Sequence, residues 1–517
     1  MRARNYALIV ASGLALAAPN AGAGTRAAVR VVPVFPLQRY AHKGAVGTVV
    51  PASGSKVSRA SAVASLVRGK LENSLLGGEP TGKPLISLGG PPAPVTVYVA
   101  LPPRGLHHNL DRYPIAIVGG GYHGILRSSA THIPGLVSIA DVAPTVRALA
   151  RGENPILSSR PATDAPAEIA SMSARLDAAH HSRKKSNRVL IGLVFGFAAL
   201  GWIFRSSLFA RAALLAVPAT VLASTIASAL HVEHRIPLWT AVLAFALTAP
   251  LAVLARTRAL FALALAFLLT TYAVFLGAGS ETVSLAALGP HPEGGGRFYG
   301  LTNQIETLLL APALTVGGLV TLPLLALVAL ASLVVVGWSR LGADGGGLIV
   351  FAAGFAALAL LRTRATPARA LAAAAAVVAV GLALVGLDAL TGGSSHVTHA
   401  VGGGPGSLLT DLGHRLRLSW HGIVDKRDHL EIAIASLVAL VALALIRPRS
   451  RTLDALLVAL AVSLLVNDSG FDILRFGALV AIAVFTVSRL TADAPRRRPA
   501  GRNLGPRPGG LWVRRDG

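Results

Sequence analysis

The chain has 517 residues, of which 53% are hydrophobic and only 14% are charged, and its mean hydropathy is +0.61. A formal net charge of +25 would point to nucleic acid in a soluble protein, but here the positive residues cluster between apolar runs and in the tail after Arg489. The positive-inside rule places them there, so we interpret the charge as topological and expect no nucleic-acid partner. The chain has no cysteine, which excludes disulfides, thiolate nucleophiles and cysteine metal sites.

The N-terminus has the features of a secretory signal peptide. Arg2 and Arg4 precede the short apolar run Tyr6–Ala18, and Ala21-Gly22-Ala23 supplies a small-x-small cleavage site. We predict a signal peptide over residues 1–23, with an uncleaved anchor helix as the alternative. In both cases the segment that follows is delivered outside the membrane.

Residues 24–161 are predicted to form an extracytoplasmic α/β domain, because strand-like and helix-like segments alternate there. The strand-like segments are Val29–Val34, Val95–Leu101 and Tyr113–Val118. Helical spacing is found in Ser58–Leu71 and Ile139–Arg151. The polar stretch 162–188 is expected to be a linker or a juxtamembrane helix.

The stretch Gly135–Leu149 reads Gly-Leu-Val-Ser-Ile-Ala-Asp-Val-Ala-Pro-Thr-Val-Arg-Ala-Leu and follows a glycine-rich segment, Gly119–Ser129. It resembles a helix start near the end of the alkaline-phosphatase/sulfatase fold, which implies a related α/β fold. Those enzymes need an aspartate-rich metal site, yet residues 24–109 contain no aspartate and only two glutamates, Glu72 and Glu79. So few hard ligands cannot hold two divalent cations. We therefore expect a binding or regulatory domain without that activity.

The next part, residues 189–490, is predicted to be a polytopic membrane domain of about eleven transmembrane helices. Its apolar runs are Val189–Phe204, Leu208–Leu230, Pro237–Ala255, Ala259–Gly277, Ile305–Leu319, Leu322–Gly337, Gly346–Leu361, Ala368–Leu387, Leu430–Ile446, Leu453–Val466 and Phe471–Leu490. Ile305–Val336 is also compatible with one broken helix or a re-entrant pair. Residues 491–517 form a basic tail.

The charges in the gaps predict an orientation. If the N-terminal domain is exported, all but one of the inner connections carry arginine, as does the tail. A charge at the centre of a membrane helix costs about 2.5–3.5 kcal/mol, so these positions are informative. The basic residues of 183–188 are an exception, which the exported domain can override. We predict a plasma-membrane protein with its N-terminal domain extracytoplasmic and its tail cytoplasmic.

In this orientation the chemically rich stretches lie on the outer side. Gly294–Glu306 combines glycines with Arg297, which can pair with a phosphate, and Tyr299, which suits an interface. Asn303 and Glu306 open the next helix, whose N-terminus favours an anion. We predict that these four residues bind substrate. The alternative is an aromatic-belt turn with capping residues.

Two candidate catalytic residues lie in short turns. Asp344, in Gly-Ala-Asp-Gly-Gly-Gly, is either a helix N-cap or an acid/base or cation-binding group. Asp468 follows Asn467 directly after an apolar run. The pair is either a simple turn or a polar group at membrane depth, where function is the default interpretation.

The long outer loop 388–429 supplies the remaining candidates. Its segment Gly413–Trp420 is predicted to be an amphipathic interfacial helix, in which Arg415 and Arg417 contact lipid phosphate. His421 is a further candidate acid/base residue. The loop also contains a His-x-x-His pair at 396 and 399, but a metal would need more ligands, so no metal site is predicted.

The membrane part resembles a group of polytopic envelope proteins from actinobacteria and clostridia. The shared stretches are Gly-Arg-Phe-Tyr-Gly-x-x-Asn at 296–303, Gly-Ala-Asp-x-Gly-Gly at 342–347 and Asn-Asp-Ser-Gly at 467–470. This resemblance implies an envelope location and no particular activity. A fainter resemblance to O-antigen ligase/polymerase proteins implies glycan transfer from polyprenyl diphosphate, although Thr302-Asn303 stands where those proteins have Pro-Asn.

These patterns together predict an outer-leaflet enzyme or assembly factor that acts on a polyprenyl-phosphate-linked glycan. The arginines at 297, 415 and 417 would hold phosphates, and Asp344, His421 or Asp468 would act as acid or base. The alternatives are a transporter or flippase with the exported domain as receptor, and a non-catalytic scaffold. The sequence identifies no cofactor and no oligomeric state.

Overall fold

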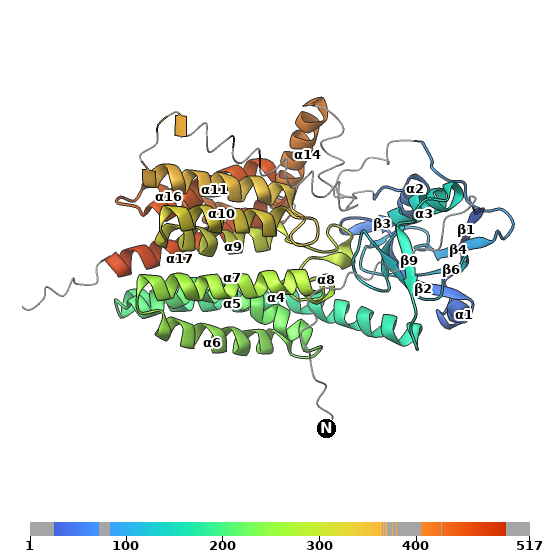
Figure 1. The fold of residues 1–517 in the computed structure, drawn as a ribbon, viewed down its shortest axis with the longest axis horizontal. Coiled ribbons are helices and arrows are strands. Elements are labelled where there is room, and N and C mark those ends of the chain that lie inside the picture. Colours follow the sequence, from blue (N-terminus) through green and yellow to red (C-terminus); the bar gives the residue numbers. More distant parts are fainter. Residues whose placement is uncertain are drawn as a thin grey trace, which may run out of the picture.

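A computed structural model describes residues 25–71, 83–363, 405–424 and 426–492, and the single positions 366, 368–369, 375 and 379. An N-terminal domain built on a β-sheet is followed by a long bundle of helices (Figure 1). The predicted signal peptide, most of the apolar run Ala368–Leu387, the His-x-x-His pair and the tail beyond Ala492 lie outside the described residues.

A seven-stranded mixed sheet forms the centre of the N-terminal domain, with the order β1-β4-β6-β2-β7-β9 and β8 paired to β2. Its strands are β1 (Ala27–Val32), β2 (Gly44–Val50), β4 (Val95–Ala100), β6 (Tyr113–Gly119), β7 (Gly124–Ser128), β8 (Leu136–Ser138) and β9 (Leu157–Arg160). β1 and β4 run parallel, whereas β2 and β6 run antiparallel. Two further strands, β3 (Lys56–Ser58) and β5 (Leu106–His108), form a separate antiparallel pair.

Helices cover the sheet. They are α1 (Gln38–Ala41), α2 (Arg59–Arg68), a 3-10 turn (Ile139–Asp141) and α3 (Val142–Arg151). The predicted strands and helices of the domain are confirmed in position, but the central strand β2 was not predicted. Every residue of β2 is buried, and a Cβ on Gly44 would lie 2.1 Å from the Ile117 carbonyl oxygen. Its glycines allow close strand approach and weaken the β-branched pattern that marks a strand in sequence.

The 39-residue helix α4 (Ala165–Ile203) joins the domain to the bundle. The stretch 162–188, expected to be a linker or a juxtamembrane helix, is mostly the first half of this helix, which Asp164 caps by accepting a hydrogen bond from the Ala167 N–H at 3.1 Å. Ile169 and Leu176 pack in the core of the domain, and Leu190 packs in the core of the bundle. One continuous helix therefore belongs to both cores.

Within the described residues, the bundle contains α4 and eleven helices that follow it. They are α5 (Ser207–Ala229), α6 (Ile236–Leu254), α7 (Arg258–Ala278), the short α8 (Ser280–Ser284), α9 (Asn303–Leu319), α10 (Leu322–Gly337), α11 (Gly345–Thr363), α14 (Pro405–Val424), α15 (Arg427–Leu445), α16 (Arg451–Val466) and α17 (Gly470–Ala492). Among the described residues, seven helices are long and apolar enough to cross a membrane, namely α4, α5, α6, α7, α11, α15 and α17. This indicates a membrane location and confirms a helical membrane protein with an N-terminal α/β domain. The segment 305–336 forms two helices, α9 and α10, that pack side by side.

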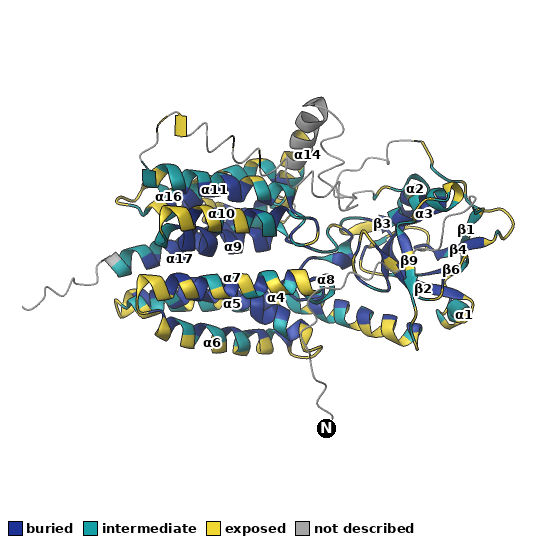
Figure 2. Cartoon of the chain, viewed as in Figure 1, coloured by how far each residue is buried: buried dark blue, intermediate teal, exposed yellow. Residues whose placement is uncertain are grey.

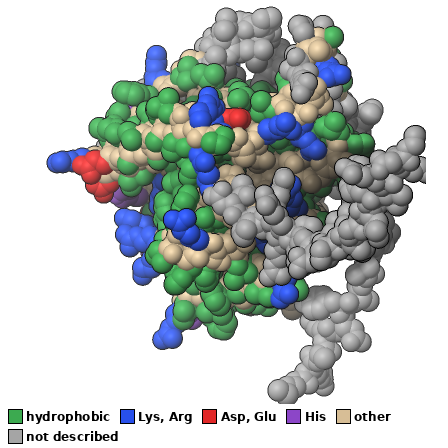
Figure 3. Space-filling model, turned by 90° about the vertical axis from the view of Figure 1, so that its left-hand side faces the viewer, with side chains coloured by type: hydrophobic (Ala, Val, Ile, Leu, Met, Phe, Trp, Pro, Cys, Tyr) green, Lys and Arg blue, Asp and Glu red, His purple; other side chains and the backbone are tan. Residues whose placement is uncertain are grey.

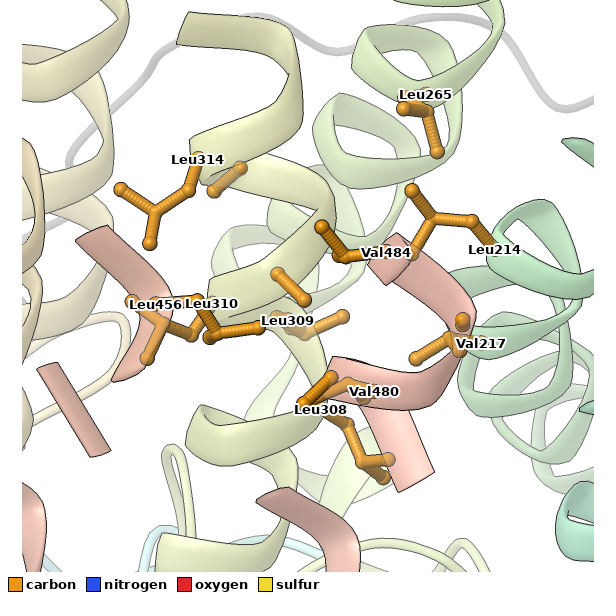
Figure 4. Packing of buried hydrophobic residues seen from close by; sticks show 14 of the residues in the cluster. Leu214, Val217, Leu265, Leu308, Leu309, Leu310, Leu314, Leu456, Val480 and Val484 are labelled. Atoms are coloured by element: carbon orange, nitrogen blue, oxygen red, sulfur yellow. The ribbon is translucent and has the colours of Figure 1, made fainter. Parts of the chain in front are cut away.

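Helices α5, α9 and α17 form the interior of the bundle. Leu308 and Leu310 of α9 lie in the same packed cluster as Val217 of α5 and Val480 of α17, and all four are fully buried (Figure 4). In contrast, α6, α7 and α10 present exposed apolar side chains outward, such as Leu263, which is 64% exposed (Figure 2). An apolar exterior around an apolar interior is typical of a bundle surrounded by lipid.

The bundle has two ends. The domain-proximal end contains the connections 230–235, 279–302, 338–344 and 467–469, and the distal end contains 204–206, 255–257, 320–321 and 446–450 (Figure 1). Figure 3 looks onto the distal end and shows Lys and Arg side chains across it. Arginines at or next to the distal end include Arg205, Arg256, Arg258, Arg362, Arg447, Arg449 and Arg451.

Candidate functional site

The connection between α8 and α9 lies against the N-terminal domain. Its Gly294 carbonyl accepts hydrogen bonds from the Gly54 N–H at 2.9 Å and from Asn109 Nδ2 at 3.3 Å. Gly295 has φ +64°, and a Cβ there would lie 2.1 Å from the Ala52 carbonyl oxygen. Only glycine combines this backbone conformation with so close an approach. The domain therefore shapes the first part of the predicted substrate-binding stretch.

The next part of this stretch contacts both the domain and the turn before α11. The centre of the half-buried Tyr299 ring lies 4.1 Å from that of His132, a residue of the N-terminal domain. The Leu301 N–H donates to the Gly342 carbonyl at 2.8 Å, and Gly300, at φ +82°, makes room for that carbonyl. The two motifs at 296–303 and 342–347 thus pack together, with Tyr299 turned toward the domain.

Arg297 and Asp344 form an ion pair. Nη1 of Arg297 lies 3.2 Å from Oδ2 of Asp344 and also donates to the Leu301 carbonyl. Oδ1 of Asp344 accepts a hydrogen bond from the Gly347 N–H at 3.1 Å, so this aspartate also caps the N-terminus of α11. The N-cap was one of the two roles predicted for it. The Asp344 side chain is 4% exposed, whereas that of Arg297 is 32% exposed. The arginine expected to bind phosphate is therefore partly accessible and already paired.

Glu306, in the first turn of α9, is fully buried. Its Oε2 accepts a hydrogen bond from Asn467 Nδ2 at 3.1 Å, and Asn467 Nδ2 also donates to Ser463 Oγ at 3.0 Å. The other carboxylate oxygen of Glu306, Oε1, has no hydrogen-bond partner among the described residues. An unpartnered buried polar atom costs about 1–3 kcal/mol, and more if it is charged, so its retention calls for an explanation.

The carboxylates of Glu306 and Asp344 lie close together because α11 begins with glycines, which leave room between them. A Cβ on Gly347 would lie 3.1 Å from Cδ of Glu306 and 3.2 Å from Cγ of Asp344. We call Arg297, Glu306, Asp344 and Asn467 the carboxylate cluster. It holds two carboxylates and one arginine, a composition suited to taking up and releasing a proton.

Two more predicted residues lie at the edge of the carboxylate cluster. Asn303 Nδ2 donates to Asp468 Oδ1 at 2.8 Å, which ties the start of α9 to the turn before α17. Asp468 is exposed and its neighbour Asn467 is buried. Five of the predicted site residues therefore meet at the domain-proximal end, namely Arg297, Asn303, Glu306, Asp344 and Asp468.

The candidates from the loop 388–429 lie on α14. The predicted helical segment Gly413–Trp420 is confirmed as part of α14, and the structure extends that helix to residues 405–412 and 421–424, which were expected to be loop. Arg417 and His421 are exposed on this helix, and the side chain of Arg415 lies outside the described part of the chain. α14 reaches the cluster through Ser419, whose Oγ donates to the Asn467 carbonyl at 3.0 Å and accepts from the Gly470 N–H at 3.2 Å.

A second polar group was not predicted. Glu293 is 4% exposed and accepts hydrogen bonds from Arg183 Nη1 at 2.6 Å and His180 Nδ1 at 3.0 Å. Burial opposes its ionisation, but the hydrogen bond from His180, the nearby His291 ring and the charge of Arg183 outweigh burial and hold the pKa of this carboxyl well below its usual range. The available signal was Arg183 itself, one of the basic residues that broke the positive-inside pattern.

Within the described residues, no group of three or more His, Asp or Glu side chains is arranged to hold a metal ion. Comparison with protein-family models, with curated proteins and with solved structures gives no match to this chain. The functional argument therefore starts from the geometry of the carboxylate cluster.

Proposed function

We propose that this protein is a membrane-embedded enzyme that acts at the bilayer surface on a lipid-linked phosphate substrate of envelope glycan assembly. The observation that carries the proposal is Oε1 of Glu306, which has no hydrogen-bond partner in the described part of the chain and is buried beside the ion-paired Asp344. A buried carboxylate oxygen without a donor is free to accept a proton from a substrate hydroxyl.

The neighbouring residues suit transfer of a sugar from a lipid phosphate. Such a reaction needs a base at the acceptor hydroxyl and positive charge at the phosphate leaving group. Glu306 would serve as the base, and the partly exposed Arg297 would hold the phosphate. A phosphate on Arg297 would compete with Asp344 for the guanidinium, and Asp344 would then be available as a second acid/base group. Asn303 and Asp468 offer an amide and a carboxylate for sugar hydroxyls.

The proposal places the domain-proximal end, and with it the N-terminal domain, outside the cell membrane. Its support is the arginine-rich distal end. Because the chain has no cysteine, single cysteines report on this directly. We expect an impermeant maleimide to label Gly296→Cys in intact cells and Arg256→Cys only after the cells are permeabilised. Both side chains would be exposed, and the reverse labelling pattern would refute the orientation.

The catalytic proposal is tested with Glu306→Gln and Asp344→Asn in a deletion strain. Loss of a general base lowers the rate by about 100-fold or more, so we expect Glu306→Gln to let lipid-linked intermediates accumulate, as measured by mass spectrometry of extracted lipids. Glu431→Gln is the matched control, because this glutamate is exposed on α15 and pairs with Arg427 on its own helix. Full activity of both cluster variants at wild-type membrane levels would contradict the proposal.

A second candidate function is proton-coupled transport with the N-terminal domain as receptor. The observation that favours it is polarity inside the bundle, where Gln304 Nε2 donates to Asn187 Oδ1 at 2.8 Å and both residues are buried. Polar groups inside membrane bundles often mark ion or substrate pathways. Proton movement in proteoliposomes that depends on Glu306 and yields no reaction product would favour transport. The absence of both an accumulated lipid-linked intermediate and Glu306-dependent proton movement would favour a non-catalytic scaffold.

A further inference from the structure

Helix α14 differs from the other helices of the bundle in direction. It lies at the domain-proximal end, crosswise to the spanning helices, and projects beyond the bundle (Figure 1). One face is attached to the bundle, since Ser419 and Ile423 pack on Gly470, where an added Cβ would lie 3.2 Å from Ser419 Cβ and 3.3 Å from Ile423 Cδ1. This contact fixes the helix beside the turn 467–470.

A second face of α14 is exposed and apolar. Leu416, Trp420 and Val424 are 41%, 62% and 38% exposed, and their spacing of four residues places them on one stripe. Arg417 and His421, also exposed, form the next stripe round the helix. An apolar stripe with tryptophan beside a basic edge is the composition of a helix in the lipid headgroup region.

We propose that α14 lies in the bilayer interface, with Leu416, Trp420 and Val424 at the acyl boundary and Arg417 on the phosphates of anionic lipids. The bilayer is the occupant that the surroundings favour. The adjoining α15 carries exposed apolar side chains such as Ile434 and Val438, so the stripe of α14 continues the lipid-facing surface of the bundle at its end. A helix that runs across the spanning direction at this level lies in the plane of the headgroups.

This docking has a consequence for the carboxylate cluster. Ser419 donates to the Asn467 carbonyl, and the side chain of Asn467 donates to Glu306. Lipid contact on one face of α14 therefore helps to hold the turn that orients Glu306, which makes Ser419 a positioning residue. The interfacial docking of α14 does not depend on the proposed chemistry, so each of the two proposals can be refuted without the other.

The test uses the full-length protein in lipid nanodiscs, with and without phosphatidylglycerol. Spin labels are placed at Trp420→Cys and His421→Cys, both exposed positions, with Gly296→Cys as a loop reference. We expect the label at 420 to be accessible to oxygen and shielded from a water-soluble nickel chelate, with the opposite ranking at 421 and 296. Equal nickel accessibility at 420 and 421, or shielding of 420 from both reagents by a protein partner, would overturn the proposal.

Two further variants test the lipid phosphate contact and the positioning role. Arg417→Gln should lower the ratio of membrane-docked to undocked spin label at position 420 about fivefold, and only in anionic nanodiscs. Arg427→Gln is the control and should leave this ratio unchanged, because Arg427 pairs with Glu431. Equal effects of the two variants would refute a specific contact at Arg417. Ser419→Val should leave the depth at 420 unchanged and speed hydrogen exchange in residues 466–470. Unchanged exchange there would overturn the positioning role.

Discussion

Replacing Gly295 by alanine should loosen the contact between the N-terminal domain and the carboxylate cluster. The φ of +64° costs a residue with a Cβ about 1–2 kcal/mol. The new Cβ would lie 2.1 Å from the Ala52 carbonyl oxygen, so one of the two backbones must move by about 1 Å. That shift breaks or stretches the hydrogen bonds that Gly54 and Asn109 donate to Gly294, each worth about 1 kcal/mol. We expect a local loss of about 3–4 kcal/mol.

Hydrogen exchange of the full-length protein in detergent measures this loss locally. Amides of residues 50–55 and 291–301 should exchange more than 100-fold faster in Gly295→Ala, while the core of the bundle stays protected. Gly296→Ala is the matched control, because Gly296 has no left-handed φ and no atom within 4 Å of an added Cβ. Identical exchange in the two variants would refute the close packing inferred for Gly295.

Two predictions concern pH. Burial raises the pKa of Asp141 to about 6, so its contribution to the stability of the N-terminal domain is fully present below its unfolded pKa near 4 and is lost as pH rises through 6. The free energy of unfolding of the domain, measured with urea, should therefore fall by about 3 kcal/mol between pH 4 and 7. The Asp141→Asn variant should not show this fall. An equal pH dependence in wild type and variant would contradict the prediction. Glu293 has the opposite sign, because its depressed pKa contributes stability above its unfolded pKa of about 4.5 that is lost as pH falls below it. Glu293→Gln should lower the free energy of unfolding by about 2 kcal/mol at neutral pH. This is less than for a fully buried pair, because the His180 side chain is 33% exposed. Hydrogen exchange at residues 289–295 that matches wild type would argue against the ion pair.

Much of the fold could be predicted because its signals are local. Runs of apolar residues mark the helices, and alternating β-branched residues mark β4 and β6 in the N-terminal domain. The signals failed where a local pattern was weak or mixed. The polar first half of α4 was compatible with either a linker or a juxtamembrane helix, because its apolar positions contact the domain on one side only, and the structure shows the helix. The central strand β2 was missed because two glycines interrupt it.

The candidate site was predictable in its parts and not in its pairing. Arg297, Glu306 and Asp344 stood out as polar residues at helix ends, and the structure places them together. Asn467, which donates a hydrogen bond to Glu306, was interpreted either as a turn residue or as a polar group at membrane depth, without a partner, and Ser419 was not singled out. The expected role of Arg297 as a free phosphate ligand was incomplete, since it already pairs with Asp344.

What the sequence determined by itself is therefore the class of molecule, a helical membrane bundle behind an α/β domain, because length, hydropathy and periodicity act within each segment. Only the tertiary structure decided which polar groups meet. Arg297 and Asp344 are 47 residues apart in the chain, and Glu306 and Asn467 are 161 apart. No local pattern encodes such a pairing, because it depends on how α9, α11 and α16 pack. Among the described residues, that packing leaves one oxygen of Glu306 without a donor, and the proposed function rests on that oxygen.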